Sequence, residues 1–202
     1  MTETTEASPL PTLKGWIVRD LVITCIVTTL LWTIHAWHSG SGVWIAALAS
    51  CLLGFLGGYV LCYVYHEWGH LIGARLAGGQ MPLAPYAGPI IGLFDLNRHS
   101  RRQFLFLSWG GVLAYVSIMV ITLVTHFAGL WGLAGAAFAV GGLAFVAQSL
   151  SVDLPQIVKV MRGANIQATS AAGANAQVIL RRTWQSWIPL ALAIAAYNTA
   201  SA

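Results

Sequence analysis

The chain has 202 residues, of which 57% are hydrophobic and only 8% are charged, whereas charged residues make up about 25% of an ordinary soluble domain. So few charges cannot cover the surface of a soluble fold of this length, which excludes a water-soluble enzyme, a disordered chain and a nucleic-acid-binding protein. The net charge of +4 comes from ten basic and six acidic residues, and each of these costs free energy in lipid unless it lies at a water boundary or has a function.

The predicted elements begin with a flexible tail over residues 1–15, which are polar, acidic and interrupted by proline. Runs without a charged side chain follow, each near the roughly 20 residues needed to cross a bilayer: 21–37, 43–65, 104–127 and 131–150. A further stretch, 187–197, is short and contains Pro189, so we expect a weak fifth span or a helix in the membrane interface. The pattern predicts an all-α polytopic membrane protein with four transmembrane helices and this weaker element.

The basic residues indicate the orientation of these spans. With the amino terminus in the cytoplasm, all ten Lys and Arg residues fall on the cytoplasmic side, as the positive-inside bias requires, and the tryptophans near the span ends agree with this placement. We therefore expect an integral protein of the bacterial cytoplasmic membrane, surrounded by the lipid bilayer. Residues 161–202 are expected to form a cytoplasmic segment and a carboxy-terminal membrane-associated helix.

Glycine residues predict which helices form the core of the bundle. Small residues let helices approach closely in lipid, where no hydrophobic force joins them. They gather in the second, third and fourth spans, as Gly54, Gly57, Gly58, Gly110, Gly111, Gly132, Gly135, Gly141 and Gly142. The first span is rich in Leu, Thr and Ile instead, so we expect it to be peripheral.

The sequence His66-Glu67-Trp68-Gly69-His70 stands at the inner end of the second span. Residues i and i+4 of a helix share a face, so both imidazoles can bind one zinc ion, while Glu67 can act as general base toward the attacking water. An alternative is that the two histidines only extend to the interface and that Glu67 pairs with Arg75. That alternative explains each residue singly but not their spacing.

A tetrahedral zinc site needs one more protein ligand besides two imidazoles and a water. Asp153 is our first choice, because it follows the fourth span directly as that span reaches the inner face, with Pro155 expected to stop or kink the chain just after it. Asp95, in the loop before the third span, is the second choice, and Asp153 has the alternative role of capping the following segment. Asp20 is expected to neighbour Arg19 or a lipid headgroup.

Three further histidines are excluded as ligands of the same ion. They lie at the outer ends of their spans, on the order of 30 Å from His66 along about 20 residues of helix, where an interfacial polar role is expected: His35, His38 and His126.

These features together resemble the site-2 proteases, zinc metalloproteases that cut transmembrane helices. HEWGHLIGARLAGG is similar to the family's zinc helix, and the 78–103 segment to the loop, often strand-forming, that follows it. Gly110 and Gly111 are similar to the glycine motif that opens the family's next helix, and Asp153 matches the aspartate that supplies the third zinc ligand. The family's Asn-containing stretch before this aspartate is replaced by Gln148 and Ser149.

The resemblance implies a membrane-embedded metalloprotease domain over 16–160, with a three-helix core formed by 43–77, 104–127 and 131–152. It implies one Zn²⁺ held by His66, His70 and Asp153, Glu67 as the catalytic base, and hydrolysis of transmembrane protein substrates near the cytoplasmic face. No PDZ or nucleotide-sensing domain is recognised in the sequence, so the membrane core, the 78–103 loop or a regulatory membrane partner is expected to select substrates.

Two other functions are compatible with parts of the sequence. A catalytically degenerate relative could bind transmembrane partners as a chaperone or assembly factor, although a structural zinc site needs no general base such as Glu67. A metal transporter should carry polar residues along the whole span, and no ionisable acid or base occurs in the run 43–65 apart from tyrosine and cysteine.

Overall fold

A computed structural model describes residues 12–85, 90–173 and 181. It contains the helices α1 (Leu13–Ser41), α2 (Trp44–Leu76), α3 (Arg101–Phe127), α4 (Gly132–Met161) and α5 (Ile166–Gly173). Four of these are long and apolar enough to cross a membrane, and no strand occurs in the described part of the chain beyond one isolated bridge. The prediction of an all-α polytopic membrane protein is confirmed. Most of the predicted tail and the whole 187–197 stretch lie outside the described residues.

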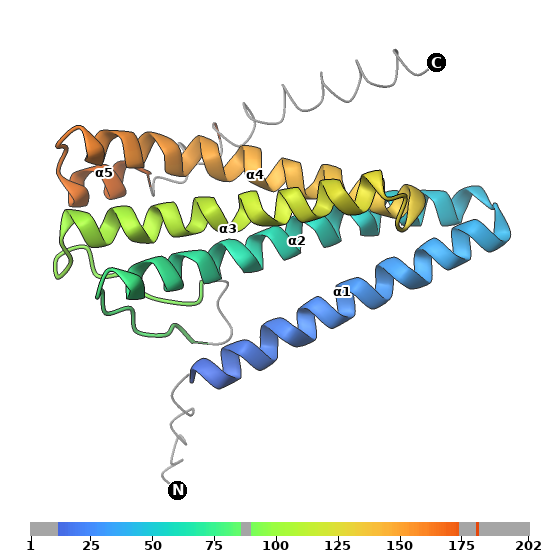
Figure 1. The fold of residues 1–202 in the computed structure, drawn as a ribbon, viewed down its shortest axis with the longest axis horizontal. Helices are drawn as coiled ribbons and strands as arrows, with labels where there is room; N and C mark the ends of the chain where they lie inside the picture. Colours follow the sequence, from blue (N-terminus) through green and yellow to red (C-terminus); the bar gives the residue numbers. More distant parts are fainter. Residues whose placement is uncertain (1–11, 86–89, 174–180, 182–202) are drawn as a thin grey trace, which may run out of the picture.

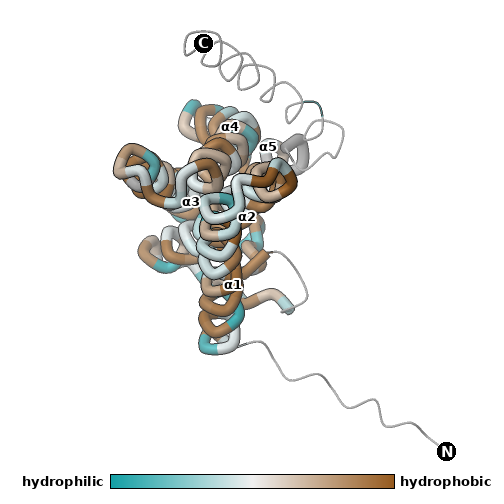
Figure 2. The backbone as a smooth tube through the Cα atoms, turned by 90° about the vertical axis from the view of Figure 1, so that its right-hand side faces the viewer, coloured by the Kyte–Doolittle hydropathy of each residue, from teal (hydrophilic) through white to brown (hydrophobic). Residues whose placement is uncertain are grey.

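Helices α2, α3 and α4 run side by side, and α1 diverges from them toward its amino-terminal end (Figure 1). In the most apolar window of α1 only 17% of residues are buried, against 56% in α4, so α1 is the peripheral helix that its composition predicts. Figure 2 shows apolar segments throughout the helix bundle. We call the "loop end" the end of the bundle where α1 and α3 begin and α2 and α4 finish, together with the loop between α2 and α3.

Helix ends are set by local capping as well as by hydropathy. The side chain of Thr12 accepts a hydrogen bond from Gly15 N (3.1 Å), so α1 begins at Leu13, inside the predicted tail. Gly42 ends α1 in the left-handed conformation, which glycine adopts without strain. Ser100 and Gln103 form a reciprocal capping box at the start of α3, satisfying backbone donors that a helix start leaves free.

Of the two effects expected of Pro155, a stop or a kink just after Asp153, the stop is contradicted. Helix α4 continues through Pro155 to Met161. A proline inside a helix removes a single backbone hydrogen bond, and here the turn that follows is anchored because Ile157 and Val160 are completely buried. Asp153 therefore lies within a helix and does not cap a new one.

The glycines bring backbones into direct contact at the helix crossings. A Cβ atom at Gly69 of α2 would overlap the carbonyl oxygen of Gly110 of α3, and one at Gly110 would overlap the carbonyl oxygen of Gly69. Between α2 and α4, a Cβ at Gly58 would overlap the carbonyl of Phe138. Such close approach replaces the missing hydrophobic force as the source of helix association in lipid.

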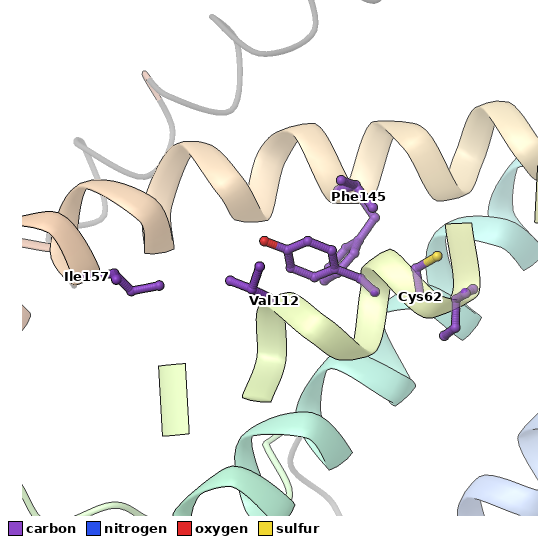
Figure 3. Packing of buried hydrophobic residues seen from close by; sticks show 7 residues of the cluster. Cys62, Val112, Phe145 and Ile157 are labelled. Atoms are coloured by element: carbon purple, nitrogen blue, oxygen red, sulfur yellow. The ribbon is translucent and has the colours of Figure 1, made fainter. Parts of the chain in front are cut away.

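Side chains from α2, α3 and α4 fill the centre of the bundle (Figure 3). Cys62, Val112, Phe145 and Ile157 belong to this buried cluster together with Tyr115. The cluster lies beside the helix segments that carry the predicted metal ligands.

The loop between α2 and α3 forms a short antiparallel pair on the loop end of the bundle. Leu83 bridges to Gly92, flanked by hydrogen bonds from Ala84 N to the Ile91 carbonyl (2.9 Å) and from Leu93 N to the Pro82 carbonyl (2.8 Å). A second buried cluster attaches this pair to the helices through Trp16, Leu71, Ala74, Met81, Ala84 and Ile91. The loop therefore packs against both the start of α1 and the end of α2.

Candidate metal centre

Two imidazoles one turn apart on α2 form the first part of the site. The Nε2 atoms of His66 and His70 lie 2.9 Å apart, because side chains at i and i+4 share a helix face. His66 is buried, and its ring stacks on Tyr115 of α3 at a centroid distance of 5.3 Å. Each imidazole thus directs its Nε2 atom toward the same point.

Asp153 of α4 completes the group. Its Oδ2 lies 3.6 Å from His66 Nε2, and the three ligand atoms of His66, His70 and Asp153 all lie within 4.8 Å of one another. Zinc bonds of about 2.0–2.2 Å in a tetrahedral site place ligand atoms roughly 3.3 Å apart. Two observed separations, 2.9 and 3.6 Å, lie on either side of that value, and all three atoms lie within 4.8 Å of one another, so the donor set is compatible with one tetrahedral metal ion such as zinc.

Hydrogen bonds outside this group fix the ligands. His70 Nδ1 lies 2.9 Å from the Leu107 carbonyl; with the proton on Nδ1, the Nε2 lone pair is free for a metal. The Ser149 hydroxyl donates to Asp153 Oδ2 (2.9 Å) from one turn earlier in α4. Partners of this kind orient metal ligands and strengthen them as donors.

Glu67 follows His66 directly on α2 but does not belong to the ligand group. Its side chain is buried, with the residue 9% exposed, and its Oε2 accepts a hydrogen bond from Ile91 N at 3.4 Å. None of the ion pairs among the described residues joins Glu67 to Arg75. The alternative of interfacial histidines and a Glu67–Arg75 pair therefore finds no support in the geometry.

The other candidate ligands are engaged elsewhere. Asp95 accepts from Asn97 N (2.9 Å) and pairs with Arg98 (3.2 Å), so it lies outside the ligand group. Asp20 pairs with Arg19, as expected from the sequence, and also accepts from the indole of Trp68 (2.7 Å). The remaining histidines at span ends lie toward the opposite ends of their helices from the loop end: His35, His38 and His126.

Sequence reasoning missed the residues that support the ligands. Ser149 had one available signal, since it precedes Asp153 by four residues and a helix brings such positions together. Its neighbour Gln148 instead accepts a hydrogen bond from the Tyr59 hydroxyl of α2, so Gln148 faces a different part of the bundle. The Leu107 carbonyl carries no sequence signal at all.

The lack of a side chain at Gly111 makes room for the imidazole rings of His66 and His70. A Cβ atom at this position would lie 2.5 Å from His70 Cε1 and 2.8 Å from His66 Cε1. Both contacts are closer than van der Waals packing permits, so any larger residue must displace the rings.

We therefore expect Gly111→Ala to weaken zinc affinity by about 10- to 100-fold, the range seen when groups that orient metal ligands are lost. Competitive zinc titration of the purified protein measures this. Gly40→Ala is the matched control, because a Cβ at Gly40 meets nothing within 4 Å. Equal zinc affinity in Gly111→Ala and the control would show that the imidazoles do not lie against this glycine.

A cavity of about 210 Å³ reaches the metal ligands from the loop end. It borders His70 and Asp153 and is otherwise lined by Phe94, Phe104, Ser108 and Gln156, among others. His66 is thus buried and the other two ligands are partly buried, and the site adjoins a space that can hold water and part of a ligand.

Comparison of the chain with protein-family models, with curated proteins and with solved structures finds no match.

Proposed function

We propose that the protein is an intramembrane zinc metalloprotease that hydrolyses peptide bonds of transmembrane protein segments near the cytoplasmic face. The observation that carries this proposal is the meeting of His66 and His70 of α2 with Asp153 of α4, together with a buried Glu67 directly after His66 in the same helix. A structural metal site needs no such carboxylate, whereas peptide hydrolysis needs a general base.

A metal ion held by these three ligands has a free coordination position for water or substrate. Three protein ligands on a tetrahedral ion leave one position open, the arrangement of catalytic zinc sites. When bound, zinc supplies a Lewis acid that polarises the scissile carbonyl and favours attack by water near neutral pH.

Glu67 is the residue we assign to proton transfer. Its carboxylate accepts a proton from the attacking water and returns it to the leaving amine, so that the peptide bond breaks into a carboxylate and an amine. Burial of Glu67 beside His66 keeps bulk water from competing for this carboxylate.

The Leu83–Gly92 pair supplies backbone groups for an unwound substrate. A transmembrane helix hides its peptide bonds in internal hydrogen bonds, so a substrate must open locally before it can be cut. Leu83 and Gly92 face each other without exchanging hydrogen bonds, so their N–H and C=O groups point to the outer edges of the pair. An extended substrate segment can add to such an edge.

The charge distribution supports the proposed side of cleavage. Every Lys and Arg residue between 12 and 173 lies within about two turns of a loop-end helix terminus or in the adjoining loops, and the site lies in the same part of the bundle. Positive-inside bias assigns that end to the cytoplasm.

Removal of the metal tests the proposal. Purified protein should contain one zinc per chain and cut a synthetic transmembrane peptide; a chelator should abolish cutting, and added zinc should restore it. A peptide with helix-weakening glycines near its cytoplasmic end is the appropriate probe. Zinc-loaded protein that binds this peptide but never cuts it would favour the binding-only alternative and overturn the protease assignment.

A further inference from the structure

The amino-terminal turns of α1 are tied to the loop that covers Glu67. Trp16 is completely buried, although most of α1 is exposed. Its indole Nε1 donates to the Ala84 carbonyl at 3.1 Å, a bond between residues that are far apart in sequence. Trp16 therefore holds the Leu83 side of the Leu83–Gly92 pair in position.

Asp20, one turn further along α1, is tied to α2. It is only 5% exposed, and its Oδ2 accepts a hydrogen bond from Trp68 Nε1 at 2.7 Å. Its Oδ1 pairs with Arg19 at 2.7 Å, and the Arg19 guanidinium lies over the Trp16 ring at 3.7 Å from the centroid. A charge-assisted bond in such a buried setting is stronger than one in water.

These contacts form a hydrogen-bond network that includes the proposed base, Glu67. Ala84 N donates to the Ile91 carbonyl (2.9 Å), and Ile91 N donates to Glu67 Oε2 (3.4 Å). Trp68, which binds Asp20, is the residue after Glu67. Trp16 therefore holds the loop residues that bind the Glu67 carboxylate. Asp20 holds Trp68, the residue next to Glu67 on α2.

We propose that Trp16 and Asp20 are positioning residues for Glu67, holding the loop and α2 so that the Glu67 carboxylate keeps one orientation toward the substrate. This inference rests on the proposed protease function. Helix α1 has four buried residues, Trp16, Asp20, Leu31 and Ile34, and the first two belong to this hydrogen-bond network. The role of α1 thus extends beyond anchoring in the membrane.

The test compares Trp16→Phe with Trp32→Phe. The first keeps an aromatic ring but removes the donor to Ala84, while the second makes the same change at a residue of α1 that is 65% exposed. We expect Trp16→Phe to lower kcat about tenfold, the effect of losing roughly one hydrogen bond's net contribution. KM for the peptide probe and the zinc content should stay near the wild-type values, and the Ile91 amide should exchange with deuterium faster.

Trp68→Phe removes the hydrogen bond from Trp68 Nε1 to Asp20 Oδ2 and should lower kcat in the same way. A rise in KM with unchanged kcat would overturn the inference, since it would mean that these residues serve substrate binding alone. Unchanged kcat and unchanged Ile91 exchange in both variants would also overturn it.

Failure of the proposed function gives a different result. Wild-type protein that cuts no peptide overturns the protease assignment and, with it, the role of Trp16 and Asp20 in positioning a base. Active wild type with fully active Trp16→Phe and Trp68→Phe overturns only the positioning role.

Discussion

Glu67→Gln is expected to lower kcat for cleavage of a transmembrane peptide by about 10²- to 10⁴-fold, the usual contribution of a general base. The amide has nearly the same shape as the carboxylate but cannot accept the proton of the attacking water. Glu67 is not among the grouped ligands, so the variant should still bind one zinc per chain. Steady-state kinetics and metal analysis on the same preparation measure the two quantities.

Glu6→Gln is the matched control for this experiment, because it makes the same chemical change in the amino-terminal sequence. If Glu67→Gln and wild type cut equally, the assigned mechanism is wrong. If Glu67→Gln loses zinc together with activity, Glu67 is a ligand and the base must be sought elsewhere.

Asp153→Ala is expected to weaken zinc binding by more than about 100-fold, since even the loss of an outer partner costs 10–100-fold. The variant removes the only ligand that α4 contributes to the group. Asp95→Ala provides the matched comparison, because its carboxylate is occupied by Arg98 and Asn97 in the loop. Zinc titration of both variants, with a thermal unfolding curve for each, separates metal loss from misfolding.

The reverse pattern, with zinc lost in Asp95→Ala and retained in Asp153→Ala, would contradict the ligand assignment. It would mean that the loop rather than α4 closes the site.

The sequence predicts the parts of the molecule that depend on local pattern. Absence of charge marks the four membrane-crossing helices, and the spacing of His66 and His70 alone places both rings on one face. Helix ends are less predictable from hydropathy, because α1 and α2 continue into residues such as Asp20 and Glu67 that interrupt an apolar run. Pro155 predicts a helix end that the structure does not have. Helix α4 continues to Met161, and Ile157 just after the proline is completely buried, which a local sequence pattern does not reveal.

Contacts between distant segments could not be foreseen. The bond from Trp16 to Ala84 depends on where a loop folds back against α1. A tryptophan at the end of an apolar span is typical of the membrane interface, so sequence pattern favours an interfacial role for Trp16, whereas the structure buries it completely. Similarly, Asp20 was expected to neighbour Arg19, but its bond to Trp68 required the packing of α1 on α2.

The glycine crossings have a consequence for the metal itself. Because Gly58 and Gly69 bring the backbones of α4 and α3 against α2, backbone packing holds together the helix segments that carry His66, His70 and Asp153. If the proposed function holds, we expect zinc to be exchangeable and not needed for folding, unlike the ion of a zinc finger, which is required for folding. Removal of the proposed ion is then expected to abolish activity without unfolding the helix bundle.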